Sequence, residues 1–166
     1  MNRRLTRISS PTHTEPVFNM KTLPVVVKWA KKHAGQLKAE AIVGCGHSGL
    51  IVGSILAYEM KIPFVAIRRP TDTPVAGGKG IDLTNFYFNY GKHPTRFVIV
   101  DDCVATGGTF RNMLKALNRN LVFGNTPQEN FPVGLLLYND WCNPYFVETM
   151  AKRLNRSVVV KIRGRS

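Results

Sequence analysis

Two adjacent acids and a glycine-threonine turn lie close together in the middle of the sequence. Asp101 and Asp102 follow the apolar run 97–100, and Thr106-Gly107-Gly108-Thr109 comes soon after them. Backbone N–H groups and hydroxyls in such a turn, at the start of a helix, suit a phosphate monoester. A phosphate alone would be repelled by the two acids, so the ligand must also offer hydroxyl donors or a metal ion. A sugar phosphate with vicinal hydroxyls and Mg²⁺ meets both demands.

The residues on either side of this turn predict a strand before it and a helix after it. Residues 97–100 are apolar and strand-favouring. After the turn, apolar side chains recur at i, i+3, i+4 and i+7, at Phe110, Met113, Leu114 and Leu117. A strand–loop–helix unit places a ligand at the carboxyl end of a buried strand. The alternative interpretation is a solvated Asp-Asp turn, but such a turn needs neither threonine and only one glycine.

The stretch from Phe97 to Thr109 resembles the 5-phosphoribosyl-1-pyrophosphate (PRPP) motif of type I phosphoribosyltransferases. That motif is an apolar strand, two acids, two spacers and then A/D-T-G-G/K-T. The resemblance implies that Asp101 and Asp102 hold the ribose hydroxyls and act in catalysis, with Mg²⁺ carried by PRPP close to them. It also implies a 5-phosphate cradle made of Ala105, Thr106, Gly107, Gly108 and Thr109.

A second glycine-rich stretch, Gly44 to Gly49, separates the predicted strand 41–43 from a predicted helix, Leu50 to Met60. Its glycines match the dinucleotide fingerprint G-x-G-x-x-G. Proteins that bind NAD place an acid at the end of the following strand, whereas here that strand, 63–67, ends in Arg68 and Arg69. The basic pair disfavours NAD and leaves NADP only weakly supported.

The phosphoribosyltransferase comparison accounts for the same residues. The glycine spacing and the strand ending in a basic pair are similar to the pyrophosphate loop and next strand of the adenine enzymes. The resemblance implies that Arg68 takes part in catalysis and that Lys79 lies on a mobile loop near the pyrophosphate. The full pyrophosphate site it implies comprises Cys45, Gly46, His47, Ser48, Gly49, Arg68, Arg69 and Lys79. The loop glycines would permit strained backbone geometry there.

The identity of the acceptor base is less well specified. Ala105 stands where hypoxanthine-guanine enzymes carry an acid and adenine enzymes carry alanine, so a purine-like base of the adenine type is favoured. However, the chain has no glutamate between Met60 and Glu129, where the adenine enzymes carry one in the mobile loop. Trp141 and Phe18 could stack on the base, and a packing role is equally open for each.

The order of predicted elements indicates one α/β domain. We expect three layers, with a mostly parallel twisted sheet flanked by helices, a Rossmann-like core of the type I phosphoribosyltransferase kind and a small variable hood. Residues 1–21 would form a basic arm or hood, 22–140 the core, and 141–166 a C-terminal helix and basic tail. Within the core, Thr22 is a candidate N-cap of a helix ending near Gly35.

The charge of +13 attracts polyanions in general. The first functional hypothesis is a transferase that joins the phosphoribosyl group of PRPP to a base and releases pyrophosphate. The alternative is a non-catalytic PRPP or nucleotide sensor that binds nucleic acid through its basic surface, although a solvated basic surface is favoured over a nucleic-acid site. We expect a homodimer.

Cysteine content and hydropathy suggest a location. Three cysteines are too sparse for a disulfide framework and favour a reducing compartment. No apolar run approaches the length of a membrane span, and the basic N-terminus lacks the apolar segment of a secretory signal. A cytoplasmic protein without a membrane partner is therefore expected.

Overall fold

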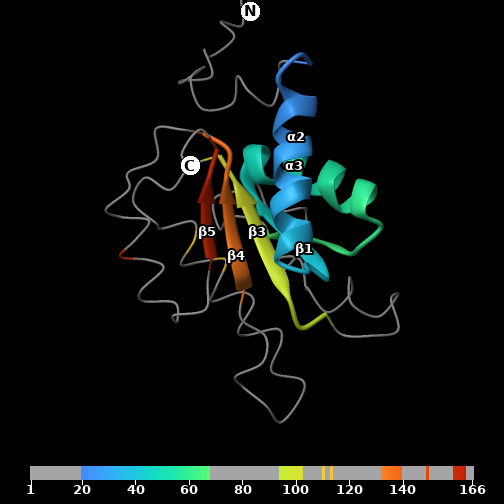
Figure 1. Cartoon of the computed structure of the whole chain (residues 1–166), viewed down its shortest axis with the longest axis vertical. Coiled ribbons are helices and arrows are strands. Elements are labelled where there is room, and N and C mark those ends of the chain that lie inside the picture. Colours follow the sequence, from blue (N-terminus) through green and yellow to red (C-terminus); the bar gives the residue numbers. More distant parts are fainter. Residues whose placement is uncertain are drawn as a thin grey trace, which may run out of the picture.

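The described residues form five parallel strands in one sheet. The computed structural model describes residues 20–67, 94–102, 110, 113, 132–139, 149 and 159–163. The strands are β1 (Ala41–Cys45), β2 (Phe64–Ile67), β3 (Phe97–Asp101), β4 (Pro132–Leu137) and β5 (Val159–Ile162). They lie in the order β2-β1-β3-β4-β5, and every pair of neighbours is parallel. Figure 1 shows β1, β3, β4 and β5 in this order. The predicted mostly parallel sheet is confirmed.

Both faces of this sheet are covered. Ile42, Val98 and Leu136 pack with side chains of two helices, α2 (Leu23–Gln36) and α3 (Gly46–Met60), in one hydrophobic core. The residues that alternate with them, such as Val43 and Ile99, are equally inaccessible. Because strands buried on both sides need a layer on each face, these burial data fit the predicted three-layer α/β architecture.

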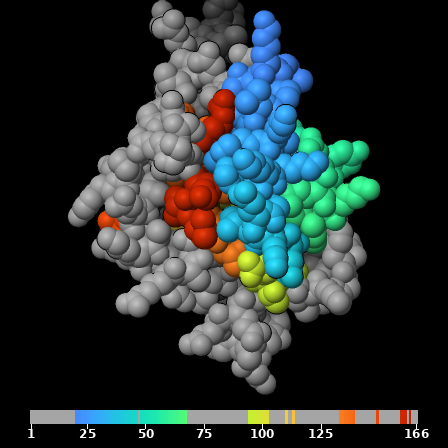
Figure 2. Space-filling model, in the orientation of Figure 1, coloured from blue at the N-terminus to red at the C-terminus, as the bar shows by residue number. Residues whose placement is uncertain are grey.

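Helix α2 begins and ends close to the predicted residues. Thr22 occupies the N-cap position, but its side chain makes no capping hydrogen bond, and Pro24 lies in the first turn. One side of the helix buries Val26, Val27, Ala30 and Ala34. The opposite side faces outward, and the helix lies across the surface of the molecule in Figure 2.

Helix α3 begins earlier than the sequence predicted. We expected a loop over Gly44–Gly49 and a helix from Leu50, but β1 extends through Cys45 and the helix starts at Gly46. Gly46 adopts a positive φ of 65°, which lets the chain turn from strand to helix within one residue. The glycine-rich stretch is therefore a strand end and a first helical turn. The described residues contain no cis peptide bond.

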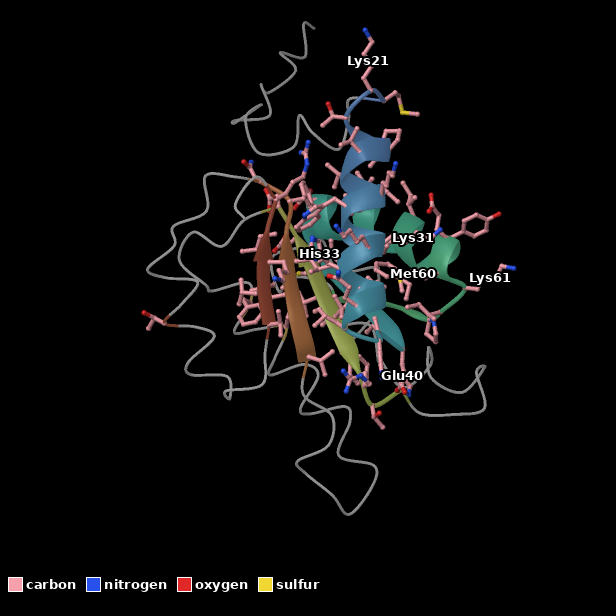
Figure 3. All side chains as sticks on the ribbon, in the orientation of Figure 1. Lys21, Lys31, His33, Glu40, Met60 and Lys61 are labelled. Atoms are coloured by element: carbon pink, nitrogen blue, oxygen red, sulfur yellow. The ribbon has the colours of Figure 1, made fainter. Side chains whose placement is uncertain are left out.

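The amino end of β3 is attached to the end of α2 by a polar cluster, which we call the Arg96–Glu40 clamp. The Arg96 guanidinium donates to the carbonyl oxygen of Leu37 through Nη2 at 2.7 Å and through Nε at 3.2 Å, and Nε also donates to the carbonyl of Lys38. Glu40 Oε2 accepts from the N–H and hydroxyl of Thr95 and from the N–H of Arg96. Glu40 lies at the end of α2 remote from Lys21 (Figure 3). The clamp therefore fixes where β3 starts.

Within the described part of the chain, no helix has the length and apolar character that crossing a bilayer requires. Several predicted features lie outside the described residues. They are the loop between β2 and β3, the turn after Asp102, most of the N-terminal arm and most of the C-terminal helix and tail.

Candidate active site at the carboxyl ends of β1 and β3

The strand order defines where a ligand would bind. The chain moves from β1 outward to β2 and then returns to β3 on the other side of β1, so the order reverses between β1 and β3. In open α/β sheets, ligands bind outside the carboxyl ends of the strands at such a switch point. Gly44 of β1 is paired with Val100 of β3, which brings Cys45 and Asp101 to the same edge of the sheet. The two stretches singled out from the sequence therefore meet.

A buried hydrogen bond joins these two stretches directly. The Ser48 hydroxyl, in the first turn of α3, donates to Asp101 Oδ1 at 3.1 Å. The same oxygen accepts the backbone N–H of Asp102 at 3.0 Å. Ser48 is 5% exposed and Asp101 is 4% exposed, whereas Asp102 is half-buried. The two acids thus differ in exposure: Asp102 is half-buried, and Asp101 is almost fully buried.

The environment of Asp101 changes its acidity. Burial raises the pKa of Asp101 well above its ordinary value, and the adjacent charge of Asp102 and a hydrogen bond between the two carboxyl groups raise it further. The N–H of Asp102 and the hydroxyl of Ser48 act in the opposite direction. Because desolvation and a like charge both disfavour ionisation, Asp101 retains its proton more readily than an exposed aspartate.

The first turn of α3 offers a site for an anion. The first N–H groups of an α-helix have no partner within the helix, and they carry a partial positive charge. Helix α3 has 15 residues, no acid in its first turn and no side-chain capping hydrogen bond from Cys45 at the N-cap. Backbone N–H groups of residues 46–49 can therefore bind phosphate oxygens next to the two acids.

Glycines allow this turn to lie directly on the sheet. A Cβ atom added to Gly49 would lie 2.8 Å from the carbonyl oxygen of Val100, and one added to Gly44 would overlap the Gly49 carbonyl group. Two of the three glycines of the apparent dinucleotide fingerprint thus serve close backbone contact between α3 and the strands. The third, Gly46, adopts the positive φ that the turn from β1 into α3 requires.

Backbone hydrogen bonds from the two residues that follow β4 complete the described part of the site. The N–H of Tyr138 donates to the carbonyl of Asp101, and the N–H of Asn139 donates to the carbonyl of Asp102 at 2.9 Å. These bonds hold the two acids against the neighbouring strand. The sequence does not reveal these bonds, because a backbone contact between distant segments leaves no residue pattern.

The structure brings together some of the predicted site residues. Asp101 and Asp102 lie beside the backbone of the first α3 turn, which contains Gly46, Ser48 and Gly49 and follows directly on Cys45. For His47 only the backbone is described. The other predicted site residues lie outside the described residues: Phe18, Arg68, Arg69, Lys79, Ala105, Thr106, Gly107, Gly108, Thr109 and Trp141.

The donor set fits magnesium that arrives with a phosphorylated ligand. Among the described residues, no group of three or more His, Cys, Asp or Glu side chains could enclose a metal ion. Mg²⁺ is usually held by one or two carboxylates together with substrate phosphates, and it retains several waters. Two adjacent carboxyl groups beside an anion-binding helix end meet that description.

The described residues form a parallel α/β fold in which an acid pair and a helix N-terminus lie together at the β1/β3 switch point. Residues 18–120 match the family model of the phosphoribosyl transferase domain. The chain belongs to this family, and the predicted resemblance to type I phosphoribosyltransferases is confirmed.

Relatives in sequence are adenine phosphoribosyltransferases. The chain is 31% identical over 122 residues to the adenine phosphoribosyltransferase of Burkholderia mallei (strain SAVP1), covering 68% of this chain and 59% of that protein. It is 36% identical over 96 residues to that of Prochlorococcus marinus (strain MIT 9313), covering 51% and 53%. The matches span 46% to 61% of the length of these relatives. These similarities confirm that the chain is closest in type to the adenine enzymes among the classes weighed from the sequence.

Solved structures share the fold. APRTase from Giardia lamblia complexed with 9-deazaadenine aligns with a TM-score of 0.60 at 20% identity, covering 92% of this chain and 85% of that one. Orotate phosphoribosyltransferase from Aeropyrum pernix aligns with a TM-score of 0.55 at 17% identity, covering 88% and 73%. At these identities the likeness establishes the three-layer fold alone.

Proposed function

We propose that the protein transfers the 5-phosphoribosyl group of PRPP to a nitrogenous base, with release of pyrophosphate. Family membership supports this reaction. The observation that carries the proposal is the hydrogen bond between Ser48 and Asp101, because it places the acid pair beside the N-terminal turn of α3. A ligand with ribose hydroxyls at one end and a pyrophosphate at the other matches these two neighbouring surfaces.

In this proposal the described residues bind and orient PRPP. Asp101 and Asp102 accept the ribose hydroxyls, and the N–H groups of residues 46–49 hold the pyrophosphate. Displacement at ribose C1 passes through a transition state with oxocarbenium character, so the negative charge of the acid pair favours it. The displaced pyrophosphate carries the developing negative charge, which the helix N-terminus stabilises.

The remaining roles fall to residues outside the described part. Arg68, Arg69 and Lys79 would neutralise the leaving pyrophosphate, and residues 105–109 would hold the 5-phosphate. Mg²⁺ bound to PRPP would supply further positive charge at the pyrophosphate. Phe18 and Trp141 are proposed contacts to the base. We also propose that the protein acts as a homodimer in the cytoplasm, and sedimentation would test the oligomeric state.

A purine is the favoured acceptor, and adenine is the first base to test because the sequence relatives are named adenine phosphoribosyltransferases. The test incubates the protein with Mg²⁺, PRPP and adenine, hypoxanthine, guanine or orotate, and measures pyrophosphate release. We expect release with adenine or another purine. Release with none of the four bases would contradict the proposed reaction.

A double variant tests the assigned site. Asp101→Asn combined with Asp102→Asn is expected to abolish turnover and to weaken PRPP binding. Glu59→Gln is the matched control, because Glu59 is an exposed acid at the far end of α3 that pairs with Lys31. Unchanged PRPP affinity in the double variant would remove the acid pair from the site.

The second candidate is a non-catalytic PRPP or nucleotide sensor that binds nucleic acid. The observation that favours it is the exposed side of α2 and its flanks, which carries basic side chains and no acid over residues 21–38: Lys21, Lys28, Lys31, Lys32 and Lys38. Such a surface would give nucleic-acid binding that weakens steeply with salt. Tight, salt-dependent binding together with no turnover on any base would favour the sensor over the transferase.

A further inference from the structure

Ser48 is a buried hydroxyl that the proposed chemistry does not use directly. We propose that Ser48 is a positioning residue, which holds the carboxyl group of Asp101 and through it the turn that carries Asp102. This inference rests on the proposed function, since it concerns the acid pair assigned there to the ribose of PRPP. It assigns the side chain of Ser48 a task different from that of the backbone N–H groups around it.

One carboxyl oxygen of Asp101 receives two of the hydrogen bonds that fix the acid pair. Asp101 Oδ1 accepts from the Ser48 hydroxyl at 3.1 Å and from the N–H of Asp102 at 3.0 Å. The hydroxyl therefore determines where Oδ1 lies, and Oδ1 in turn holds the backbone at Asp102. The half-buried Asp102 is the more accessible of the two acids. A hydroxyl 53 positions before Asp101 thus orients Asp101 and, through it, the neighbouring Asp102.

The backbone around Ser48 is held firmly enough for this task. Gly49, the next residue, packs against the carbonyl oxygen of Val100, and Gly44 packs against the carbonyl group of Gly49. The first turn of α3 therefore has direct backbone contact with β1 and with the residue that precedes Asp101. Ser48 and Asp101 are both at least nine-tenths buried, so water does not readily replace the hydroxyl.

The arrangement also links the two halves of the proposed PRPP site. The turn whose N–H groups would bind the pyrophosphate is the turn whose side chain holds Asp101. Any movement of that turn is transmitted to the acid pair through a hydrogen bond of 3.1 Å. The hydrogen bond between Ser48 and Asp101 consequently fixes the distance between the proposed pyrophosphate and ribose sites.

Three substitutions test this role. Ser48→Ala removes the hydroxyl, and we expect kcat/KM for PRPP to fall about 10- to 100-fold, the range for a hydrogen bond to a charged or buried acid. KM for the base should change much less, since the base does not contact this hydrogen bond. Ser48→Thr keeps the hydroxyl and should restore most of the activity. Ser54→Ala is the control: its hydroxyl donates to Ile51 on the exposed side of the same helix, and its loss should leave the kinetics unchanged.

A measurement on the ligand-free protein separates this inference from the proposed function. In Ser48→Ala the N–H of Asp102 should exchange with solvent about tenfold faster by NMR, because its acceptor is no longer fixed. Failure of the wild-type protein to bind PRPP would overturn the proposed function, whereas unchanged exchange at Asp102 would overturn the positioning role. So would a folded Ser48→Ala protein with unaltered kcat/KM for PRPP. If Ser48→Ala does not fold, Ser48→Cys, of similar size but a weak donor, must show the same losses.

Discussion

The close contact between Gly44 and Gly49 gives a test of how α3 is positioned. In Gly44→Ala the new Cβ would lie 2.7 Å from the carbonyl carbon of Gly49, a separation below 3.0 Å that real Cβ atoms essentially never show. Both groups belong to the backbone of packed elements, so no side chain can rotate away. The first turn of α3 would have to move outward by roughly half an ångström or more.

The cost of that movement has two parts. Overpacking a close-packed interior costs about 1–3 kcal/mol. The displaced turn also lengthens the 3.1 Å hydrogen bond from Ser48 to Asp101, and its loss costs about 1 kcal/mol more. We therefore expect Gly44→Ala to lower the free energy of unfolding by about 2–4 kcal/mol. For a chain of this size, that corresponds to a Tm lower by about 5–15 °C.

Thermal unfolding followed by circular dichroism measures this difference, and Gly35→Ala provides the matched control. Gly35 lies in α2, and a Cβ added there would meet no atom within 4 Å. That substitution should stabilise the protein by about 0.5–1 kcal/mol, since alanine favours the helix more than glycine does. If Gly44→Ala melts within about 2 °C of the wild type, backbone contact does not position α3 and the reasoning above is refuted.

Four further substitutions probe the acids and the clamp. Asp101→Asn should raise the Tm at pH 7. Folding raises the pKa of Asp101, so the wild-type protein loses stability as the pH rises from about 4, the pKa of an unfolded aspartate, through the pKa of Asp101 in the folded protein. Melting curves between pH 4 and 8 should show the variant's advantage shrinking toward pH 4, and an equal Tm at every pH would contradict this. Glu40→Gln should have the opposite profile, because hydrogen bonds from Thr95 lower the pKa of Glu40. The ionised Glu40 side chain therefore stabilises the folded protein above about pH 4, and this stabilisation is lost as the pH falls through the pKa of Glu40 in the folded protein. The Tm of Glu40→Gln should be below that of the wild type at pH 7 and equal to it in acid. Arg96→Ala should lower the free energy of unfolding by about 1–3 kcal/mol in urea titrations, because the carbonyl of Leu37 loses its donors. Arg96→Lys should lower it by less. If the free energy of unfolding of Arg96→Lys equals that of the wild type, a positive charge alone is sufficient at this position.

The strands could be predicted from the sequence because strands buried on both faces read as continuous apolar runs. The runs 97–100 and 41–43 became β3 and β1, with one or two more residues at their carboxyl ends. The start of α3 could not be predicted in the same way. Glycine is a poor helix former, yet Gly46 and Gly49 lie in the first turn of α3. Gly46 supplies the positive φ of the turn, and packing against β3 leaves no room for a side chain at Gly49.

The acid pair was recognisable as chemistry, but its internal contacts were not. Aspartates after an apolar strand stand out in any sequence, whereas a hydrogen bond between Ser48 and Asp101 depends on strand order and on the position of α3. The Arg96–Glu40 clamp could not be predicted for the same reason, since it joins Glu40 to Thr95 and Arg96, which are 55 and 56 positions away in the chain. Contacts between distant segments become visible only when the topology is known.

The burial of Asp101 has a consequence for anyone who evolves this protein in the laboratory. A screen that rewards heat resistance alone should enrich amide replacements at that position, because the folded chain tolerates an ionised group there at a cost. If Asp101 acts as proposed, the selected variants would be more stable but inactive, a trade-off between stability and activity that is common at functional positions. Libraries intended to increase thermal stability should therefore keep residue 101 constant and measure catalytic activity together with the Tm.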